Sequence, residues 1–261
     1  MLITVKDVNG MGYADFVAFI GQHNTPPGGE ETIKKWGKLG KIDRNSYILD
    51  LACSTGFSSR SIVKTCNCKS IGIDISRTAI ETAKFYADLD EITNKAHYVV
   101  GDASNLQFSK ETFTHIFAGC NFGFIQEREK ALAECNRVLT KYGILCIANF
   151  YYITTPPEDL LELVANAIGF KPNYQWTYDW WSSFFNKQFI LRQEEDNELQ
   201  FADEKQISEA IHTFIYTNSK SLNGFSDEIK SAAYNRLLKI RLILNEHRKY
   251  QRFNITLWNR K

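Results

Sequence analysis

The stretch Ile48-Leu49-Asp50-Leu51-Ala52-Cys53-Ser54-Thr55-Gly56 decides the fold of this chain, because an apolar strand ends in an acid and small residues then open a helix. Ligands of open α/β sheets bind at the carboxyl ends of the strands, near the point where the strand order reverses. Small side chains after such a strand let a ligand approach the backbone. We therefore predict that this loop lines a ligand site.

Further apolar runs alternate with amphipathic segments through about residue 150, which predicts βαβ units around a parallel sheet. Ser76 is expected to cap a helix that runs to about Leu89, and another helix is expected over 127–139. The strictly alternating segment 253–258 is typical of a half-exposed or edge-side strand. The sequence thus predicts an α/β fold with a doubly wound sheet, whose first five strands are expected at 47–51, 70–75, 96–100, 114–119 and 144–150.

The pattern changes beyond residue 150, where Pro156-Pro157 is expected to begin a helix and Ser226 to cap a long one. Aromatic residues are about twice as frequent between 151 and 189 as the chain average of 13%, and Trp181, Phe185 and Phe189 recur there at helical spacing. Such a stripe is typical of core packing, and the wall of an apolar or cation-holding acceptor pocket is the alternative.

Composition points to a small-molecule partner. Lys and Arg total 31 against 30 Asp and Glu, so no net charge draws the chain to nucleic acid or to an anionic membrane. No apolar run approaches the length of a membrane span, and Met1 is not followed by the pattern of a signal peptide, so we expect a cytoplasmic protein. The pair Cys66 and Cys68 lacks further ligands at zinc-site spacing, so no metal is expected.

Two more acids end predicted strands, Asp74 after the second and Asp102 after the third. A carboxylate at Asp74 can accept both hydroxyl hydrogens of a ribose, and one at Asp102 can accept from an adenine amine. The alternative for each is an aspartate that only caps its own loop. Their joint order along the chain favours cofactor binding.

Together these positions resemble the motifs of class I S-adenosylmethionine-dependent methyltransferases over roughly residues 45–150. The segments 131–139 and 141–143 resemble the helix and turn before the family's fifth strand, and 253–258 resembles its antiparallel seventh strand. The resemblance implies a seven-stranded, mainly parallel, Rossmann-like sheet with an N-terminal helical lid and a late helical, aromatic insertion. The cofactor-binding residues that it implies are Asp50, Ala52, Cys53, Ser54, Gly56, Asp74, Ile75, Asp102, Ala103 and Cys120.

The loop departs from the family at Ala52 and Ser54, where glycine is usual. A dinucleotide needs those glycines because its pyrophosphate packs against the backbone at a helix N-terminus. S-adenosylmethionine has no phosphate, so alanine and serine are compatible with it. The absence of G-x-G-x-x-G argues against a nicotinamide cofactor.

We expect a lid over 1–44, a cofactor-binding core over 45–153, and a cap with C-terminal strands over 154–261. The turn 24–29 is a candidate flap hinge. Methyl transfer needs alignment of the acceptor and no dedicated nucleophile. The candidate acceptor-binding residues are Tyr13, Asn121, Phe122, Tyr178, Trp180 and Trp181, and the unranked candidate bases are His23, His115, Tyr151 and Tyr152.

The leading hypothesis is therefore methyl transfer from S-adenosylmethionine to a small molecule, with S-adenosylhomocysteine as product, by a monomer or homodimer. One alternative keeps the cofactor and takes RNA or protein as acceptor. Another is a catalytically silent binding protein, since the altered glycine loop is also compatible with lost cofactor binding. The acceptor atom, N, O or C, is left open.

Overall fold

Seven strands within residues 3–261, the part of the chain that this computed structural model describes, form one sheet in the order β3-β2-β1-β4-β5-β7-β6. Strands β1 to β5 are parallel, and β7 runs antiparallel to both β5 and β6. The strand order reverses between β1 and β4, as the doubly wound prediction requires. The strands are β1 Tyr47–Leu51, β2 Lys69–Asp74, β3 Ala96–Val100, β4 Phe113–Gly119, β5 Leu139–Tyr152, β6 Phe189–Asn197 and β7 Gln251–Arg260.

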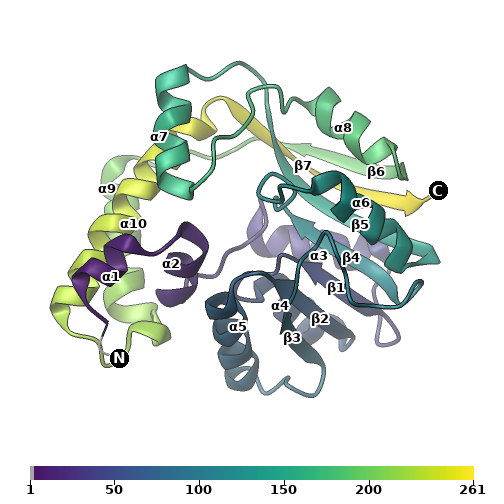
Figure 1. The fold of residues 1–261 in the computed structure, drawn as a ribbon, viewed down its shortest axis with the longest axis horizontal. Coiled ribbons are helices and arrows are strands. Elements are labelled where there is room, and N and C mark those ends of the chain that lie inside the picture. The colour runs from purple at the N-terminus through teal and green to yellow at the C-terminus, as the bar shows by residue number, and fades with distance from the viewer. Residues whose placement is uncertain (1–2) are drawn as a thin grey trace.

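Helices cover both faces of this sheet (Figure 1). Ile116 and Phe117 are neighbours on β4 and point to opposite faces, each into a separate apolar core. The helices on the Phe117 face are α3 Gly29–Gly40, α4 Phe57–Cys66 and α5 Arg77–Leu89, and those on the Ile116 face are α6 Arg128–Val138 and α8 Tyr178–Asn186. The fold class predicted from the sequence is confirmed.

A group of helices stands beside the sheet and has an apolar core of its own (Figure 1). Val8, Phe16, Leu237 and Ile240 are buried in this core, so the N-terminal helices pack against a helix from the far end of the chain. These helices are α1 Val5–Gly10, α2 Tyr13–Phe19, α7 Glu158–Ile168, α9 Glu204–Thr213 and α10 Asp227–Arg248, with the short turns η1 Phe214–Asn218 and η2 Lys220–Leu222.

The N-terminal segment is divided between two parts of the fold. α1 and α2 belong to the helical group, whereas α3 packs on the sheet, where Trp36 is fully buried with its ring 4.7 Å from that of Phe117. Of the predicted lid segment 1–44, residues 29–40 therefore belong to the sheet layer, and the lid role of the segment before α3 stays a prediction.

Two expectations near the end of the sheet are wrong, and two elements were not predicted. The unpredicted elements are β6 and α9, and Phe189 begins β6 instead of continuing the helical stripe of Trp181 and Phe185. β7 is an interior strand with both faces covered, because Leu257 and Trp258 enter opposite cores. The polar members of the alternation are Asn254 and Thr256, and Thr256 is itself buried, where its hydroxyl oxygen accepts the indole N–H of Trp258 (2.8 Å).

Candidate functional site

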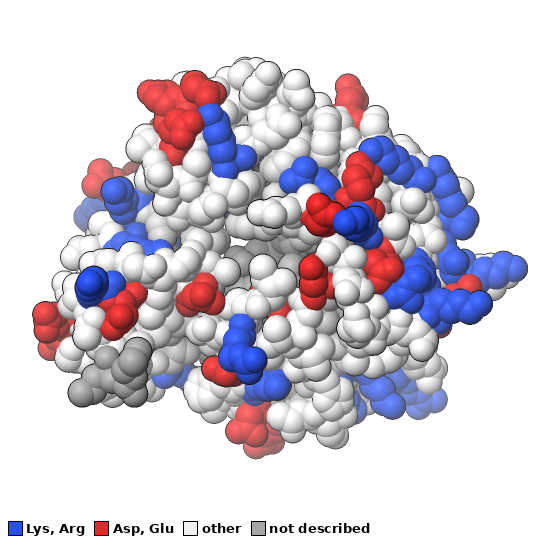
Figure 2. All heavy atoms as spheres, viewed as in Figure 1, with Lys and Arg blue, Asp and Glu red and all other residues white. Residues whose placement is uncertain are grey.

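A cavity of about 810 Å³ opens at the carboxyl ends of β1 to β4, between the sheet and the helical group. In Figure 2 the recess between these two parts shows mostly uncharged atoms, and basic and acidic side chains are interspersed around it. Of the predicted cofactor residues, seven line this cavity: Ala52, Ser54, Asp74, Ile75, Asp102, Ala103 and Cys120. The chain thus brings four strand ends, distant in sequence, to one site.

The loop after β1 has three residues in the left-handed region, Ala52 at φ 47°, Ser54 at φ 49° and Gly56 at φ 72°. Such angles are uncommon for residues with a Cβ and favour glycine. At Gly56 a Cβ would also lie 2.6 Å from the ring of Tyr98, so only glycine fits there. The loop backbone therefore keeps the glycine conformation even where alanine and serine occupy it.

Asp74 fixes this loop and still has capacity for a ligand. One carboxylate oxygen accepts the N–H of Ser54 (2.9 Å) and the other the N–H of Ser76 (2.9 Å). A carboxylate has about four acceptor positions, so one on each oxygen remains for the cavity. Burial raises the pKa of Asp74. Two hydroxyls of a ribose match the two remaining positions.

The other three predicted cofactor residues, Asp50, Cys53 and Gly56, do not line the cavity. Asp50 is only 4% exposed and accepts the backbone N–H of Ser59 (3.0 Å), which is a donor of the first turn of α4. Burial raises the pKa of Asp50 to about 6. Asp50 therefore anchors α4 under the cofactor loop, and its direct contact with cofactor stays a prediction.

The shifted pKa of Asp50 predicts a pH-dependent effect of Asp50→Asn on stability. A raised pKa contributes stability that is present below the unfolded pKa of about 4 and lost as the pH rises through about 6. Asparagine keeps an oxygen that can accept the N–H of Ser59, and it has no carboxyl group whose ionisation would destabilise the fold as the pH rises. We expect equal unfolding free energies near pH 4 and a gain of about 2 to 3 kcal/mol for the variant at pH 7. Urea denaturation at both pH values measures this, and a difference independent of pH would contradict it.

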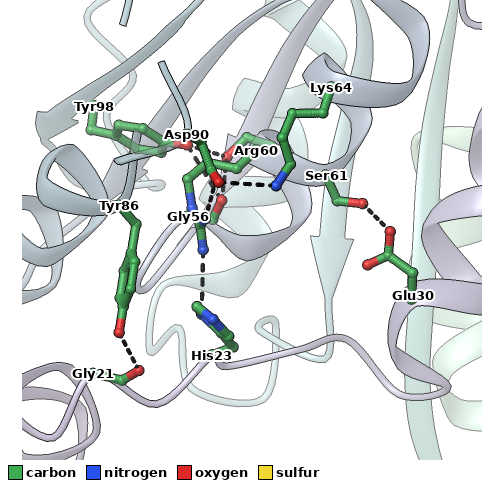
Figure 3. Close-up of polar contacts among 11 residues, drawn as sticks. Gly21, His23, Glu30, Gly56, Arg60, Ser61, Lys64, Tyr86, Asp90 and Tyr98 are labelled. Atoms are coloured by element: carbon green, nitrogen blue, oxygen red, sulfur yellow. Dashed lines mark hydrogen bonds and ion pairs between the residues drawn. The ribbon is translucent and has the colours of Figure 1, made fainter. Parts of the chain in front are cut away.

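The segment 20–30 closes one side of the cavity and is tied to α4 and α5 (Figure 3). The hydroxyl of Tyr86 donates to the carbonyl oxygen of Gly21 (2.9 Å), and the guanidinium of Arg60 donates to Nδ1 of His23 (3.3 Å). Since a guanidinium has no acceptor, the neutral His23 ring carries its hydrogen on Nε2. Burial, followed by the charge of Arg60, lowers the pKa of His23. His23 lines the cavity but has no free basic nitrogen.

The same segment contacts the cofactor loop directly. Thr55 donates from its hydroxyl to the carbonyl oxygen of Gln22 (3.0 Å). At the end of β4, a Cβ on Gly119 would lie 2.8 Å from Cβ of Pro26, so glycine there allows the turn 24–29 to approach. The predicted flap is thus seated over the loop.

Among the other candidate bases, Tyr152 alone lines the cavity. His115 contacts the carbonyl oxygen of Gly40 (3.0 Å) beneath the sheet, and Tyr151 donates to Asp196. The Tyr152 hydroxyl instead lies 2.8 Å from Nε2 of His247 on α10, a cavity residue that sequence reasoning missed. Burial, then the charge of Arg248, lowers the pKa of His247 to about 4, so its ring is neutral at pH 7 and can accept the phenol hydrogen.

The aromatic wall of the cavity is only partly the predicted one. Tyr13, Asn121 and Trp181 line it. Phe122 is buried in the sheet core, Tyr178 donates to Glu194 (2.8 Å), and Trp180 stacks on Phe184 outside the lining. The additional lining residues include Phe124, Phe170, Trp176, Arg241, Leu244 and Arg248. For the two arginines, the sequence offered only one indication that they share a site, namely that about two helical turns separate Arg241 from Arg248.

Gln22 and Asn121, two residues that line the cavity, each have a buried side-chain oxygen, Oε1 and Oδ1, with no hydrogen-bond partner within residues 3–261. The Asn121 side chain donates to the carbonyl oxygen of Leu51, which leaves its oxygen free. Unpaired buried acceptors are costly and call for a donor. The ammonium group of a methionine moiety over the loop supplies such donors, so the residues present fit S-adenosylmethionine.

Comparisons with known proteins agree with this geometry. Residues 49–147 match a family model described as a methyltransferase domain. A solved structure of MccD protein is 41% identical and superimposes with a TM-score of 0.78, over 91% of this chain and 100% of that one. Sterol 24-C-methyltransferase of Kluyveromyces lactis is 32% identical over 77 residues, which are 30% of this chain and 21% of the enzyme. Demethylmenaquinone methyltransferase of Thermotoga maritima is 33% identical over 101 residues, 38% of this chain and 42% of the enzyme.

Proposed function

Because this chain belongs to the class I S-adenosylmethionine-dependent methyltransferases, enzymes that release S-adenosylhomocysteine, we propose that its acceptor is a small organic molecule bound between the cofactor loop and α10. The main support for this proposal is that a single cavity extends from Asp74 and Asp102 past Tyr152 to Arg248. The names of two relatives, a sterol and a demethylmenaquinone methyltransferase, also refer to small molecules.

The position of the segment 20–30 favours a small acceptor over RNA or protein. It is bonded to α5 through Tyr86 and to the cofactor loop through Thr55, so it narrows the approach to the reacting centre. A polymer would need an open groove, whereas a small molecule needs only to enter and be enclosed. The interspersed charges of Figure 2 also offer no continuous basic band on that face for nucleic acid.

The residues of the site have separable roles. Asp74 has acceptors for the ribose, Asp102 is placed at the adenine end, and Gln22 with Asn121 provides acceptors for the ammonium group. When bound, S-adenosylmethionine supplies an electrophilic methyl group on a sulfonium. The aromatic wall excludes water around that centre.

A proton released by the acceptor has a defined receiver in this arrangement. The Tyr152 oxygen can accept it while its own hydrogen passes to Nε2 of His247. Burial disfavours the imidazolium form of His247, so the pair suits acceptors that lose their proton late, after the bond to carbon has begun to form.

The proposal is tested by incubating the protein with S-adenosylmethionine labelled in its methyl group and a small-metabolite extract. We expect the label in one or a few small molecules, together with an equal amount of S-adenosylhomocysteine. Label in RNA or protein instead would contradict the small acceptor. A sulfonium carries three carbon substituents, and transfer of the aminocarboxypropyl group instead would leave the labelled methyl group in 5′-methylthioadenosine. Label in 5′-methylthioadenosine without S-adenosylhomocysteine would therefore contradict methyl transfer itself.

The silent-protein alternative has its own measurement. Binding of S-adenosylhomocysteine stabilises the folded state by RT ln(1 + L/Kd), where L is the free ligand concentration, so the melting temperature rises with ligand concentration. A clear rise at saturating ligand is the expected result. No rise at millimolar ligand would favour a protein that has lost the cofactor.

A further inference from the structure

We propose that Arg241 and Arg248 of α10 form an anion subsite for the acceptor, so that the enzyme acts on a small molecule carrying a phosphoryl or carboxylate group. This inference rests on the proposed function and names the substrate class of the same cavity. An anion site was not expected from the sequence, because the chain as a whole is nearly neutral and its net charge does not reveal a local pair of cations.

The two arginines lie on one face of α10 and line the same cavity. Seven residues, or about two helical turns, separate them, which places both side chains on one side of the helix. Leu244 and His247 from the same face also line the cavity. Burial raises the pKa of Tyr13, and the charges of Arg241 and Arg248 oppose that rise, so the phenol lies near both guanidiniums.

Neither guanidinium has an ion-pair or hydrogen-bond partner within the described residues 3–261. Both side chains are half-buried. Burial, followed by the like charge of Arg241, lowers the pKa of Arg248. A buried charge without a partner is unfavourable, and two together more so. The arrangement is stabilised when an anion binds between them.

Arg236, on the same helix, has a structural role and serves as a comparison for Arg241 and Arg248. Its guanidinium donates to the backbone carbonyl oxygens of Val8 and Met11 and stacks on Phe16 at 4.2 Å. Arg241 and Arg248 make no such contacts among the described residues. Their guanidinium donors are therefore available to a ligand, and two guanidiniums match a phosphoryl group, which carries about two negative charges.

The cofactor's own carboxylate is the competing occupant. The family resemblance assigns the methionine part of the cofactor, which carries this carboxylate, to the loop 52–56, and Gln22 and Asn121 beside that loop suit the adjoining ammonium group. Arg241 and Arg248 instead come from α10, together with Tyr152's partner His247. Because the arginines lie on the acceptor side, replacing them should weaken the binding of an acceptor anion and leave the binding of the cofactor carboxylate unchanged.

The test is calorimetric titration of inorganic phosphate, inorganic pyrophosphate and succinate into protein saturated with S-adenosylhomocysteine. We expect binding to the wild type, weakened about tenfold or more by Arg241→Gln and by Arg248→Gln. Lys239→Gln, an exposed cation on the same helix outside the cavity, is the matched control and should leave the anion affinity unchanged. Tighter binding of phosphate than of succinate assigns a phosphoryl acceptor, and the reverse assigns a carboxylate.

Three further readings separate the explanations. Affinity for S-adenosylhomocysteine should be the same in the wild type and both variants, and a tenfold loss would overturn the proposal by placing the cofactor carboxylate on the arginines. Equal anion affinity in the wild type and variants, or none in the wild type, would also overturn it. If the wild type fails to bind S-adenosylhomocysteine, the proposed function fails first. Melting without anion checks folding, and neither variant should melt below the wild type, because each substitution removes an unpaired charge.

Discussion

Replacing Asp74 by alanine is expected to weaken the binding of S-adenosylhomocysteine by a factor of about 100 or more. Each hydrogen bond from a ribose hydroxyl to this carboxylate is of the charged kind, contributing about 1.5 to 3 kcal/mol, and two are lost together. The loop itself also loosens, because Asp74 accepts the N–H groups of Ser54 and Ser76. Calorimetric titration of the ligand measures the loss directly.

Asp88→Ala is the matched control for this prediction. Asp88 is an exposed acid on α5 that does not line the cavity, so its loss changes the net charge equally without touching the site. The affinity of Asp74→Asn for S-adenosylhomocysteine should lie between those of Asp74→Ala and Asp88→Ala, since an amide oxygen still accepts one hydrogen bond. An affinity for Asp74→Ala within a factor of three of the wild type would show that the ribose binds elsewhere.

The second large effect is expected from Gly56→Ala, which should lower the free energy of unfolding by about 2 to 5 kcal/mol. Part of this is the left-handed backbone at φ 72°, which costs an alanine about 1 to 2 kcal/mol. The rest is a Cβ placed 2.6 Å from the buried ring of Tyr98, an overpacking that costs about 1 to 3 kcal/mol. Urea denaturation gives the total.

Gly169→Ala separates the two contributions. Gly169 ends α7 at φ 84°, but a Cβ there would meet nothing within 4 Å. The free energy of unfolding lost in Gly169→Ala should therefore equal the conformational part alone, about 1 to 2 kcal/mol. If Gly56→Ala costs no more than Gly169→Ala, the Tyr98 ring moves aside and the contact does not explain why glycine occupies this position.

Local signals allowed most of the sheet and the cofactor half of the site to be predicted. Ser76 and Ser226 accept hydrogen bonds from the first turns of α5 and α10, as their sequences indicated. Asp74 ends β2, Asp102 lies two residues after the end of β3, and both line the cavity as expected. These features depend on residues a few positions apart, which a sequence displays directly.

The acceptor half was not predictable because its determinants are long-range. β6 is an edge strand whose sequence is polar after Leu191, so it has no clear alternation to reveal it. The residues of α10 that face the cavity, Arg241, His247 and Arg248, flank an apolar stripe that already accounts for the helix. Contacts such as Tyr152 with His247 join residues 95 positions apart. Only the assembled fold brings them together.

The position of β7 has a consequence for how this protein is made. Within the sheet, β6 pairs with no described strand other than β7, and β7 lies between it and β5 although it comes last of the seven in sequence. A nascent chain on the ribosome therefore exposes two unpaired strand edges, on β5 and β6, until residues 251–260 have emerged. Open edges of this kind invite pairing with other chains. Folding of the sheet is thus completed after translation has passed β7, and a chain that stops before it would be a target for chaperones and proteases.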